Sequence, residues 1–527
     1  MSSELADVPA LPSLFDYLAY WARETPDAEA LVEGDLRVSY AELSRRVEAI
    51  AGAMKAAGIG AGDRVATLDG PTVAFVETFL AANAVGAIWL GLNPKYRSRE
   101  LAQVIEDAAP GLLFFADAGS SRNYRGELEA IVAGLGLDCQ LVPLEQGEAP
   151  GSLDSWVDAH RPKAADAGPW QVDGNRAGLL VYTSGSTGTP KGALLRNGAI
   201  TRFAIRQNAL WPLKPHRVLN YFPINHIGCV IDMFAPCLVA GGATVLMEQF
   251  DPLEALLLIE RERLTLWGSV PSVFTLQLAL PEIARVDFSS VQLIVWEGAA
   301  MPVDTVRALR AICPRLATNY GMTETTSAIT ALAPTADLQL LTGTVGRPYP
   351  GVAVRLCDER GVVVERGTPG EVQTYSDQLT MGYWRNPTAT RAAFTEDGWF
   401  RTGDIAVERD DGYIAIVGRV KEMFKSGGYN VYPREIEVAI EELDGVDCAA
   451  VVSVDDPLWQ EVGVAFVAAA AQRLDGQDLE RHCKARLANY KVPKHFVVLE
   501  SLPLLPIGKV DKVSLKSRAG ALFGSEA

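Results

Sequence analysis

The residues best suited to chemistry lie in the stretch YTSGSTGTPKG, residues 182–192. Eight of its eleven positions are Gly, Ser or Thr, none is acidic, and Lys191 contributes a positive charge. Glycines allow a backbone to turn tightly, and hydroxyl and backbone N–H groups donate hydrogen bonds to phosphate oxygens. The pattern therefore indicates a phosphate-binding loop, although its lysine does not stand in the Gly-Lys-Ser/Thr order of the P-loop. A flexible surface turn is the alternative.

Three further segments carry side chains suited to a nucleotide. Residues 319–325, NYGMTET, place an aromatic ring beside glycine, where it can stack on a purine. In the same segment Glu324 can hold Mg²⁺, which takes only one or two protein carboxylates when it is bound with a nucleotide. Residues 399–404, WFRTGD, end in an aspartate that can accept hydrogen bonds from both ribose hydroxyls. Residues 506–509, PIGK, place a lysine near the C-terminus. Each segment taken alone also fits an ordinary turn, hairpin or tail.

The residues around these segments predict alternating helices and strands. A capping box that begins at Ser39 starts a helical pattern that continues through Ala57. Short apolar runs at residues 64–68, 112–115 and 178–182 suit inner strands. Strands that alternate with helices argue for α/β layers with a substantial parallel sheet. Because the phosphate-loop candidate directly follows the run at 178–182, we expect its backbone amides to lie at the end of that strand.

The amino-acid composition of the chain changes after about residue 340. Glycine and proline become frequent between short β-like runs, which indicates a β-rich subdomain that ends near Gly418. A small α/β unit is predicted from Val420 onward, and in it Pro433 suits a first helical turn. The apolar residues of one helix face follow it at i, i+3, i+4 and i+7, namely Ile436, Ala439, Ile440 and Leu443.

The predicted fold class is therefore α/β with two domains. Residues 1–419 form a large N-terminal domain of α/β layers with the β-rich subdomain, and residues 420–527 form a small, mobile C-terminal α/β domain. The length of 527 residues is too great for one compact core.

Composition excludes several classes of protein. The net charge of −17 repels nucleic acid and anionic membranes, and the seven cysteines show no C-x-x-C spacing for a zinc site or disulfide framework. The N-terminus lacks the basic start and apolar core of a secretory signal, and the apolar region at residues 78–92 is short and broken by Asn83. We expect a soluble cytoplasmic protein with no nucleic-acid partner and no membrane span. Monomer and homodimer both stay open.

In order and spacing, the four segments resemble the core motifs of the adenylate-forming superfamily. This superfamily includes acyl-CoA synthetases, peptide-synthetase adenylation domains and firefly-type luciferases. The resemblance covers essentially the whole chain, is strengthened by GRVKEMFKSGGYNVYPREIE at residues 418–437, and is greatest to acyl- or aryl-CoA synthetases. It implies that ATP, with Mg²⁺, and a small carboxylic acid give an acyl-adenylate and pyrophosphate, and that coenzyme A then takes the acyl group as a thioester and releases AMP.

The resemblance assigns residues to each task. Tyr320 would stack on adenine, Asp404 would bind the ribose, and Glu324 would hold Mg²⁺. The catalytic set would be Lys509, Thr323, Glu324 and His226. The ATP-binding set would be Thr183, Ser184, Gly185, Ser186, Thr187, Gly188, Lys191, Gly298, Ala299, Ala300, Thr318, Asn319, Tyr320, Gly321, Met322, Thr323, Asp404, Ile416, Arg419 and Lys509. Lys509 would bridge the carboxylate and the α-phosphate, where a fixed cation stabilises the charge of the transition state.

The C-terminal domain carries the second half-reaction in this family. The resemblance places a hinge at Lys421, about which that domain would rotate to remove Lys509 and present a second face. The coenzyme A set would be Gly427, Gly428, Tyr490 and Lys494. Residues 481–495, RHCKARLANYKVPKH, are basic and lack acids, so they could meet the phosphates of coenzyme A; a solvated helix face is the alternative.

The acid pocket would be formed by His226, Val230, Trp267 and Trp296. Two tryptophans indicate an apolar substrate, such as an aromatic, cyclic or medium-chain acid. The sequence departs from the family where Glu297 precedes Gly298, since two glycines are usual. Glu297 either points away from the pocket or favours a substrate with a donor group. Thr318 also stands where Asn, Gln or Asp usually meets the adenine amino group.

Two competing functions remain. In the first, the enzyme passes the acyl group to a carrier protein or another non-CoA acceptor. The aspartate that binds the ammonium group in peptide synthetases is absent next to His226, although Asp232 lies close. In the second, the chain is a non-enzymatic nucleotide-binding remnant, which is disfavoured because all the expected catalytic positions are filled.

Overall fold

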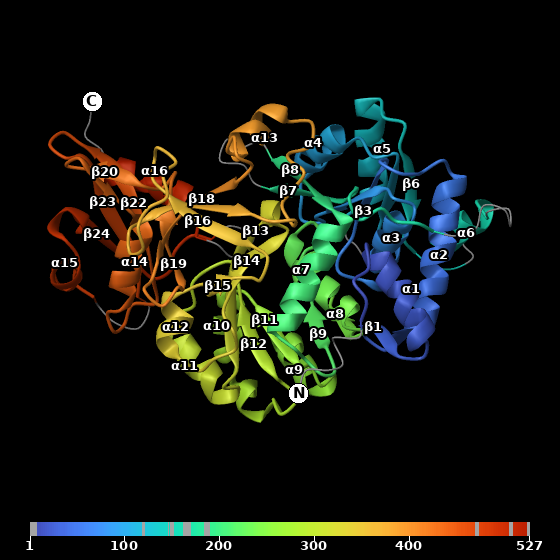
Figure 1. The fold of residues 1–527 in the computed structure, drawn as a ribbon, viewed down its shortest axis with the longest axis horizontal. Helices are drawn as coiled ribbons and strands as arrows, with labels where there is room; N and C mark the ends of the chain where they lie inside the picture. The colour runs from blue at the N-terminus through green and yellow to red at the C-terminus, as the bar shows by residue number, and fades with distance from the viewer. Residues whose placement is uncertain are drawn as a thin grey trace.

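The computed structural model describes residues 8–117, 122–145, 147, 152–161, 170–183, 190–469, 474–504 and 510–523. Two sheets with helices packed on them make up most of the chain, a four-stranded sheet follows, and a smaller C-terminal unit lies at the opposite end from the six-stranded sheet (Figure 1). This arrangement confirms the predicted α/β class with a large N-terminal and a small C-terminal domain.

A six-stranded sheet with the order β6-β5-β3-β4-β7-β8 is parallel except for its last strand. Its strands are β3 Arg64–Leu68, β4 Ile88–Leu92, β5 Leu112–Phe115, β6 Gln140–Pro143, β7 Ala177–Thr183 and β8 Lys191–Arg196. The helices between them are α3 Val73–Ala84, α4 Ser98–Ala108, α5 Tyr124–Leu135 and α6 Leu153–Ala159. The strands predicted at 64–68 and 112–115 are confirmed.

A nine-stranded sheet holds most of the candidate site, with the order β15-β14-β13-β12-β11-β9-β10-β1-β2. Its strands are β1 Glu29–Glu33, β2 Leu36–Ser39, β9 Arg217–Asn220, β10 Ala243–Leu246, β11 Leu266–Ser269, β12 Leu293–Trp296, β13 Leu316–Met322, β14 Ser327–Ala331 and β15 Arg347–Pro348. Strands β11, β12 and β13 are parallel neighbours, so their carboxyl ends meet at one edge of the sheet. Ligands of open α/β sheets bind at such edges.

The helices of this half, in chain order, are α1 Leu14–Glu24, α2 Tyr40–Ala56, α7 Asn197–Leu210, the π-helix η2 Gly228–Phe234, α8 Ala235–Val239, α9 Pro252–Arg261, α10 Pro271–Leu278, η3 Pro281–Arg285, α11 Val303–Ile312, η4 Thr323–Thr325 and α12 Leu338–Gly343. Helix α2 begins after Ser39, whose hydroxyl accepts a hydrogen bond from the Glu42 amide at 3.2 Å. The Glu42 carboxylate pairs with Arg46 instead of reaching back to the cap.

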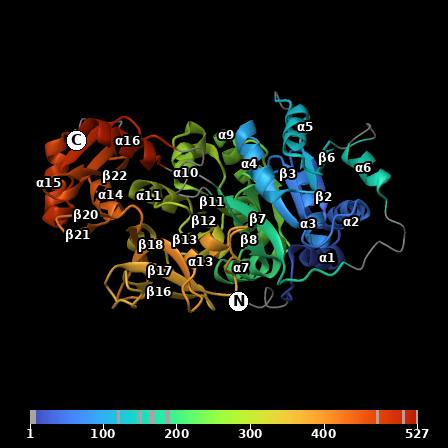
Figure 2. The ribbon, with the colours of Figure 1, turned by 90° about the horizontal axis from the view of Figure 1, so that it is seen from above.

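The β-rich part and the C-terminal unit follow. An antiparallel sheet with the order β16-β17-β18-β19 confirms the predicted subdomain. Its elements are β16 Ala353–Cys357, β17 Gly370–Tyr375, α13 Pro387–Ala393, β18 Phe400–Glu408 and β19 Ile414–Arg419. The C-terminal elements are β20 Phe424–Ser426, β21 Tyr429–Val431, α14 Pro433–Glu441, β22 Cys448–Asp456, β23 Gln460–Ala468, α15 Gly476–Arg486, η5 Asn489–Lys491, β24 His495–Leu499 and α16 Lys512–Phe523. Seen from above, they form a body of their own beside the four-stranded sheet (Figure 2).

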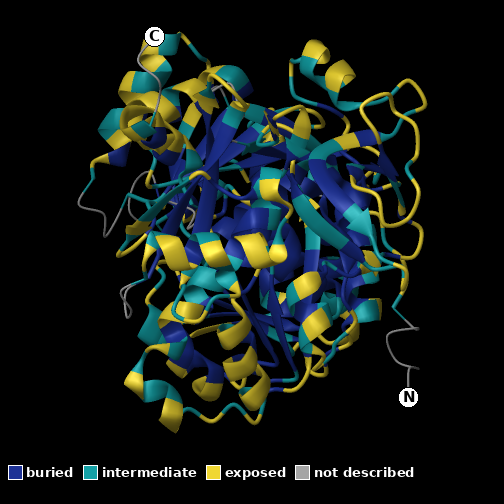
Figure 3. Cartoon of the chain, turned by 90° about the vertical axis from the view of Figure 1, so that its left-hand side faces the viewer, coloured by how far each residue is buried: buried dark blue, intermediate teal, exposed yellow. Residues whose placement is uncertain are grey.

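Apolar side chains fill both faces of the nine-stranded sheet, and the strands are buried while the outer helix faces are exposed (Figure 3). In α14 the predicted face is confirmed, because Ile436, Ala439 and Ile440 are buried. Among the described residues, no helix is long and apolar enough to cross a membrane.

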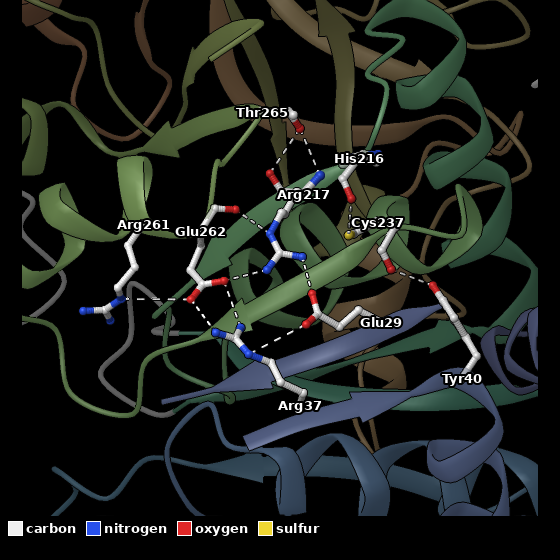
Figure 4. A network of polar contacts seen from close by, with 10 residues as sticks. Glu29, Arg37, Tyr40, His216, Arg217, Cys237, Arg261, Glu262 and Thr265 are labelled. Carbon is white, nitrogen blue, oxygen red and sulfur yellow. Dashed lines mark hydrogen bonds and ion pairs between the residues drawn. The ribbon is translucent and has the colours of Figure 1, made fainter. Parts of the chain in front are cut away.

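A charge network fastens the edge of the nine-stranded sheet (Figure 4). The carboxylate of Glu262 accepts from Arg37 at 2.8 and 2.9 Å and from Arg217 at 2.6 Å, and Glu29 pairs with both arginines. The side chain of Glu262 is only 6% exposed, and the two guanidinium groups hold the pKa of this carboxyl below its usual range. The network thus ties β2 and β9 to the end of α9.

We expect Glu262→Gln to lower the free energy of unfolding of the large domain by about 1.5–3 kcal/mol, because the arginines lose a charged acceptor in a buried setting. Urea denaturation followed by tryptophan fluorescence measures the change. Glu254→Gln is the matched control, since its pair with Arg261 is 43% and 54% exposed and should change stability by less than about 1 kcal/mol. Because the folded pKa of Glu262 is depressed, its contribution is present above the unfolded pKa and is lost as pH falls through the folded pKa. A difference from wild type that persists unchanged in acid would contradict this account.

Candidate active site

The predicted phosphate loop is the connection of a β-hairpin. Thr183 and Lys191 are paired across β7 and β8, and the Thr183 hydroxyl donates to the Lys191 carbonyl at 3.3 Å. The strand β8 thus lies between this stretch and α7, because residues 191–196 pair antiparallel with β7. Among the predicted ATP-binding residues, Ser184, Gly185, Ser186, Thr187 and Gly188 lie outside the described residues, as does Lys509.

A tyrosine joins this hairpin to the predicted magnesium ligand. The Tyr383 hydroxyl donates to Glu324 Oε1 at 2.8 Å, and Lys191 Nζ lies 5.4 Å from the centroid of the Tyr383 ring. Burial and, after it, the Glu324 charge raise the pKa of Tyr383, so the hydroxyl stays protonated as a donor. Tyr383 therefore contacts both a cation over its ring and a carboxylate at its hydroxyl, the two residues predicted to bind phosphates and Mg²⁺.

The backbone around Glu324 is held in an uncommon conformation. Thr326 and Ser327 both have positive φ, +50° and +74°, a region that β-branched Thr rarely adopts. A Cβ on Gly321 would lie 2.1 Å from the Ser327 carbonyl oxygen, so only glycine permits this close hairpin. The result is a rigid turn in which η4 presents the buried Thr323 and the neighbouring Glu324.

Tyr320, four residues before Glu324, belongs to a second cluster. Its hydroxyl donates to Asp404 Oδ2 at 2.7 Å, and Arg419 Nε lies 2.9 Å from Asp404 Oδ1. Asp404 is 4% exposed, whereas the Arg419 side chain is 58% exposed. Burial first, and then the Asp404 charge, raises the pKa of Tyr320. Three of the predicted nucleotide-binding residues, Tyr320, Asp404 and Arg419, are thus brought together. Ile416 is half-buried on β19, three residues before Arg419.

The predicted adenine wall follows the end of β12. Gly298 has φ of +84° and, like Ala299 and Ala300, is exposed. Thr318 donates its hydroxyl to the Trp296 carbonyl at 2.9 Å, which occupies that donor within the sheet. Met322, at the end of β13, donates its amide to the Thr325 hydroxyl at 2.9 Å. Residues 298–300 and 318–322 therefore lie at adjoining strand ends, as the family likeness implies.

A small buried cavity of about 10 Å³ lies beneath this edge. Its lining is both apolar and acidic and includes Gln207, Trp211, Asp232, Met233, Glu297 and Asn319. Burial is the largest cause that raises the pKa of Glu297, and the charge of Asp232 raises it further. Burial also raises the pKa of Asp232, to about 6.

The residues expected to wall the acid pocket lie elsewhere. Trp267 stacks on Phe288 at 5.2 Å between ring centroids, and with Trp296 it belongs to the apolar cluster on the other face of the sheet. Alternate residues of a strand point to opposite faces, so these positions face away from the cavity that Leu266 and Val295 line. Val230 is fully buried in the main core. This placement corrects the expected set, and of the four only His226 lies at an accessible position.

His226 is exposed at the start of η2, and its Nδ1 accepts a hydrogen bond from the Gly228 amide at 3.0 Å. The neutral ring therefore carries its proton on Nε2. The ring is fixed in orientation by its own backbone.

The residues predicted for coenzyme A lie together on the C-terminal unit. Tyr490 stacks on Tyr429 with ring centroids 4.5 Å apart, and Lys494 Nζ lies 5.6 Å from the Trp459 ring centroid. Gly427 has φ of +58° and donates its amide to the Trp459 carbonyl at 2.8 Å. Gly428, at φ of +83°, follows it in the same turn. Tyr429 and Trp459 are 60% and 41% exposed, so the aromatic group is open to solvent.

Lys421 lies in an exposed turn between β19 and β20. The turn is closed by hydrogen bonds from the Glu422 and Met423 amides to the Arg419 carbonyl. The connection between the four-stranded sheet and the C-terminal unit is therefore a single short turn.

Sequence reasoning missed Tyr383, Tyr429, Trp459 and Gln207. Tyr383 follows Gly382 in the stretch TMGYWRNP, where an aromatic pair beside glycine resembles the pattern used to find Tyr320. Tyr429 directly follows the predicted Gly428, so an exposed aromatic there could have been suspected. Nothing in the local sequence points to Trp459 or Gln207.

Comparisons with known proteins identify the family. Residues 18–384 match the family model of the AMP-binding enzyme, and residues 435–509 match the AMP-binding enzyme C-terminal domain. The chain belongs to the AMP-binding enzyme family. The resemblance to the adenylate-forming superfamily is confirmed.

Individual relatives match over nearly the whole chain. A feruloyl-CoA synthase of Amycolatopsis sp is 34% identical over 501 residues, 95% of this chain and 97% of the relative. A long-chain-fatty-acid–CoA ligase of Mycobacterium tuberculosis, FadD13, is 32% identical over 511 residues, again 95% and 97%. The crystal structure of ATP-bound MatB from Rhodopseudomonas palustris superposes with a TM-score of 0.86 at 28% identity and covers 97% of this chain and 99% of that one. The predicted enzyme class, an AMP-forming acyl-CoA synthetase, is confirmed by these relatives.

We expect Tyr383→Phe to lower the rate of pyrophosphate exchange roughly tenfold and to raise the Mg²⁺ concentration at half-maximal rate, because Glu324 loses a donor that fixes its carboxylate. ATP–pyrophosphate exchange measured over a Mg²⁺ series tests both effects. Tyr375→Phe, on an exposed tyrosine of β17, should change neither. A slower rate with an unchanged Mg²⁺ dependence would show that Tyr383 does not act through Glu324.

Proposed function

We propose that this protein is an ATP-dependent carboxylic acid:CoA ligase with its nucleotide site at the end of β13. The observation that carries the proposal is that one strand end serves two clusters. Tyr320 donates to Asp404, which also pairs with Arg419, while Glu324, four residues after Tyr320, accepts from Tyr383 beside Lys191. A nucleoside and its phosphates require such neighbouring sites, and an aromatic, a ribose acceptor, a cation and a carboxylate are the groups that they use.

In the first half-reaction, a carboxylate oxygen attacks the α-phosphorus of ATP and pyrophosphate leaves. Lys191 and the hairpin connection hold the β- and γ-phosphates, and Thr323 contacts phosphate. Glu324 holds Mg²⁺. The described residues contain no group of three or more metal-binding side chains, which fits a magnesium ion held mainly by phosphates and water. Lys509 neutralises the charge that develops at phosphorus.

In the second half-reaction, the thiol of coenzyme A attacks the acyl carbonyl, AMP leaves and the thiol proton is released. We propose that residues 420–527 rotate about the turn at Lys421, relative to residues 1–419, to exchange Lys509 for the aromatic group of the C-terminal unit. Gly427 and Gly428 let the pantetheine arm pass close to backbone. Tyr490 and Lys494, with Tyr429 and Trp459, offer stacking surface and charge to coenzyme A.

The substrate is an apolar aromatic, cyclic or medium-chain acid. Trp211, Met233, Leu266 and Val295 give the cavity an apolar side, and they replace the tryptophans expected from sequence. The relatives named above include a feruloyl-CoA synthase and a long-chain-fatty-acid–CoA ligase, so both an aryl and an alkyl acid are represented among them. Transfer to a carrier protein or another non-CoA acceptor is the alternative function, and it has less support because these curated relatives are CoA ligases.

Purified protein supplied with ATP, Mg²⁺, coenzyme A and a panel of acids should release pyrophosphate and form AMP and an acyl-CoA in equal amounts. Pyrophosphate detection identifies the accepted acids, and mass spectrometry identifies the thioester. Turnover that continues without coenzyme A to a product other than the adenylate would refute the ligase reading and favour the alternative acceptor.

Lys509→Ala should reduce adenylate formation at least a hundredfold while thioester formation from a supplied acyl-adenylate stays within a few-fold of wild type, because the cation acts only at the α-phosphorus. The two half-reactions are assayed separately. Arg518→Ala, an exposed basic residue of α16, serves as the control and should leave both unchanged. Equal loss of both half-reactions in Lys509→Ala would contradict the exchange of surfaces.

A further inference from the structure

The cavity beneath β12 and β13 contains acceptors without donors. Asp232 Oδ1 and Gln207 Oε1 are buried and accept no hydrogen bond from the described residues. Asp232 and Gln207 are only 6% and 5% exposed, so solvent does not satisfy them from outside. Gln207 uses its amide nitrogen on the Asp232 carbonyl at 3.4 Å, which leaves its oxygen free to face the cavity. A buried acceptor without a donor costs about 1–3 kcal/mol, so two in one cavity call for an occupant.

The second feature is a pair of neighbouring carboxyl groups. Glu297 and Asp232 both line the cavity, and burial raises the pKa of each. Asn319 supplies a hydrogen bond to Glu297, and Ser327 supplies one to Asp232, but these are neutral groups. The hydroxyl of Tyr349 lies close enough for both carboxyls to raise its pKa, after the larger effect of burial, yet it has no hydrogen-bond partner among the described residues. A carboxyl group keeps an accepting oxygen in either protonation state, so the cavity is suited to a hydrogen-bond donor.

Size and access limit what this group can be. A volume of about 10 Å³ admits one water-sized atom, such as a hydroxyl oxygen or an amine nitrogen. Glu297 is half-buried and the next three residues are exposed, so the cavity lies directly under the open end of β12. Met233 forms part of the wall, and a Cβ on Gly268 would lie 2.4 Å from its Cε, so Gly268 allows Met233 to lie against β11. Methionine has flexible torsions, so its movement can widen the cavity.

We propose that this cavity is the inner end of the acid-binding pocket and that Asp232, Glu297 and Gln207 select acids carrying a hydroxyl or amino group at the end remote from the reacting carboxylate. The inference rests on the proposed ligase function. Its residues adjoin those of the nucleotide site, because Glu297 precedes the wall at 298–300 and Asn319 precedes Tyr320. An acid whose remote donor occupies the cavity directs its carboxylate toward the end of β13.

The test compares acids that differ only at the remote end: phenylpropanoic acid with its para-hydroxy, para-amino and para-methoxy derivatives, and octanoic acid with its terminal hydroxy and amino derivatives. We expect kcat/KM for a donor-bearing acid to exceed that of its unsubstituted or methoxy partner roughly tenfold or more, since buried acceptors left unpaired penalise the wrong substrate. The para-hydroxy acid offers a neutral donor, whereas the terminal amino derivative of octanoic acid offers a cation. Comparing the kcat/KM values of these two acids, each relative to its unsubstituted partner, shows which kind of donor the cavity prefers. Equal kcat/KM values within each set would overturn the proposal.

Substitutions at two residues test whether this cavity causes the preference for donor-bearing acids. Asp232→Asn and Glu297→Gln should each reduce the donor-to-apolar ratio of kcat/KM about tenfold. Asp304→Asn, with a side chain 91% exposed, is the matched control. If Asp232→Asn fails to fold, the half-buried Glu297→Gln still decides, and an unchanged ratio in that variant overturns the proposal. Pyrophosphate release from none of the acids would refute the ligase function itself, whereas equal release from all of them would refute only this inference.

Discussion

The carboxylate of Asp404 is the point at which three parts of the structure meet. Its two oxygens receive Tyr320 from the nine-stranded sheet and Arg419 from the last strand before the C-terminal unit. Asp404 itself lies on β18 of the four-stranded sheet. Because Asp404 is buried while Arg419 is exposed, the carboxylate is fixed and the guanidinium has room to move. The carboxylate of Asp404 therefore links β13, the strand that precedes Glu324, to the residue next to the connecting turn.

The rigidity of the β13–η4 segment explains how one strand end can serve both nucleoside and phosphates. Positive φ at Thr326 and Ser327, and the close approach that Gly321 permits, leave the segment few alternative conformations. Tyr383 adds a direct hydrogen bond to Glu324 from a position 59 residues further along the chain. The backbone geometry of this segment and the neutral Tyr383 hydroxyl thus fix the position of Glu324, the predicted magnesium ligand. The overall negative charge of the chain does not prevent anion binding, because a cation, Lys191, lies close to the same ring.

Much of the fold could be predicted from sequence because its strands are short apolar runs with clear boundaries, as at 64–68 and 112–115. The helix face of α14 followed from spacing alone. The orientation of Trp267 and Trp296 could not be predicted, because alternation defines two faces without saying which one meets the cavity. Tyr383, Trp459 and Gln207 reach their partners through contacts between distant segments, and single-sequence patterns contain no record of such contacts. Glu297 was visible as a departure from the family, but its partner Asp232 required the structure.

The position of that partner depends on an unusual helix. Residues 228–234 form a fully buried π-helix, a rare conformation that is frequent at functional sites. It begins two residues after His226 and carries both Asp232 and Met233, consecutive residues that line the same cavity. The π-helix therefore places a carboxyl group, Asp232, beside a flexible apolar side chain, Met233, in the wall of one cavity. Replacing Asp232 by an apolar residue would relieve an unsatisfied buried acceptor, so its presence is costly to stability and is most simply explained by what the cavity binds. Stability and specificity therefore place opposite demands on this position.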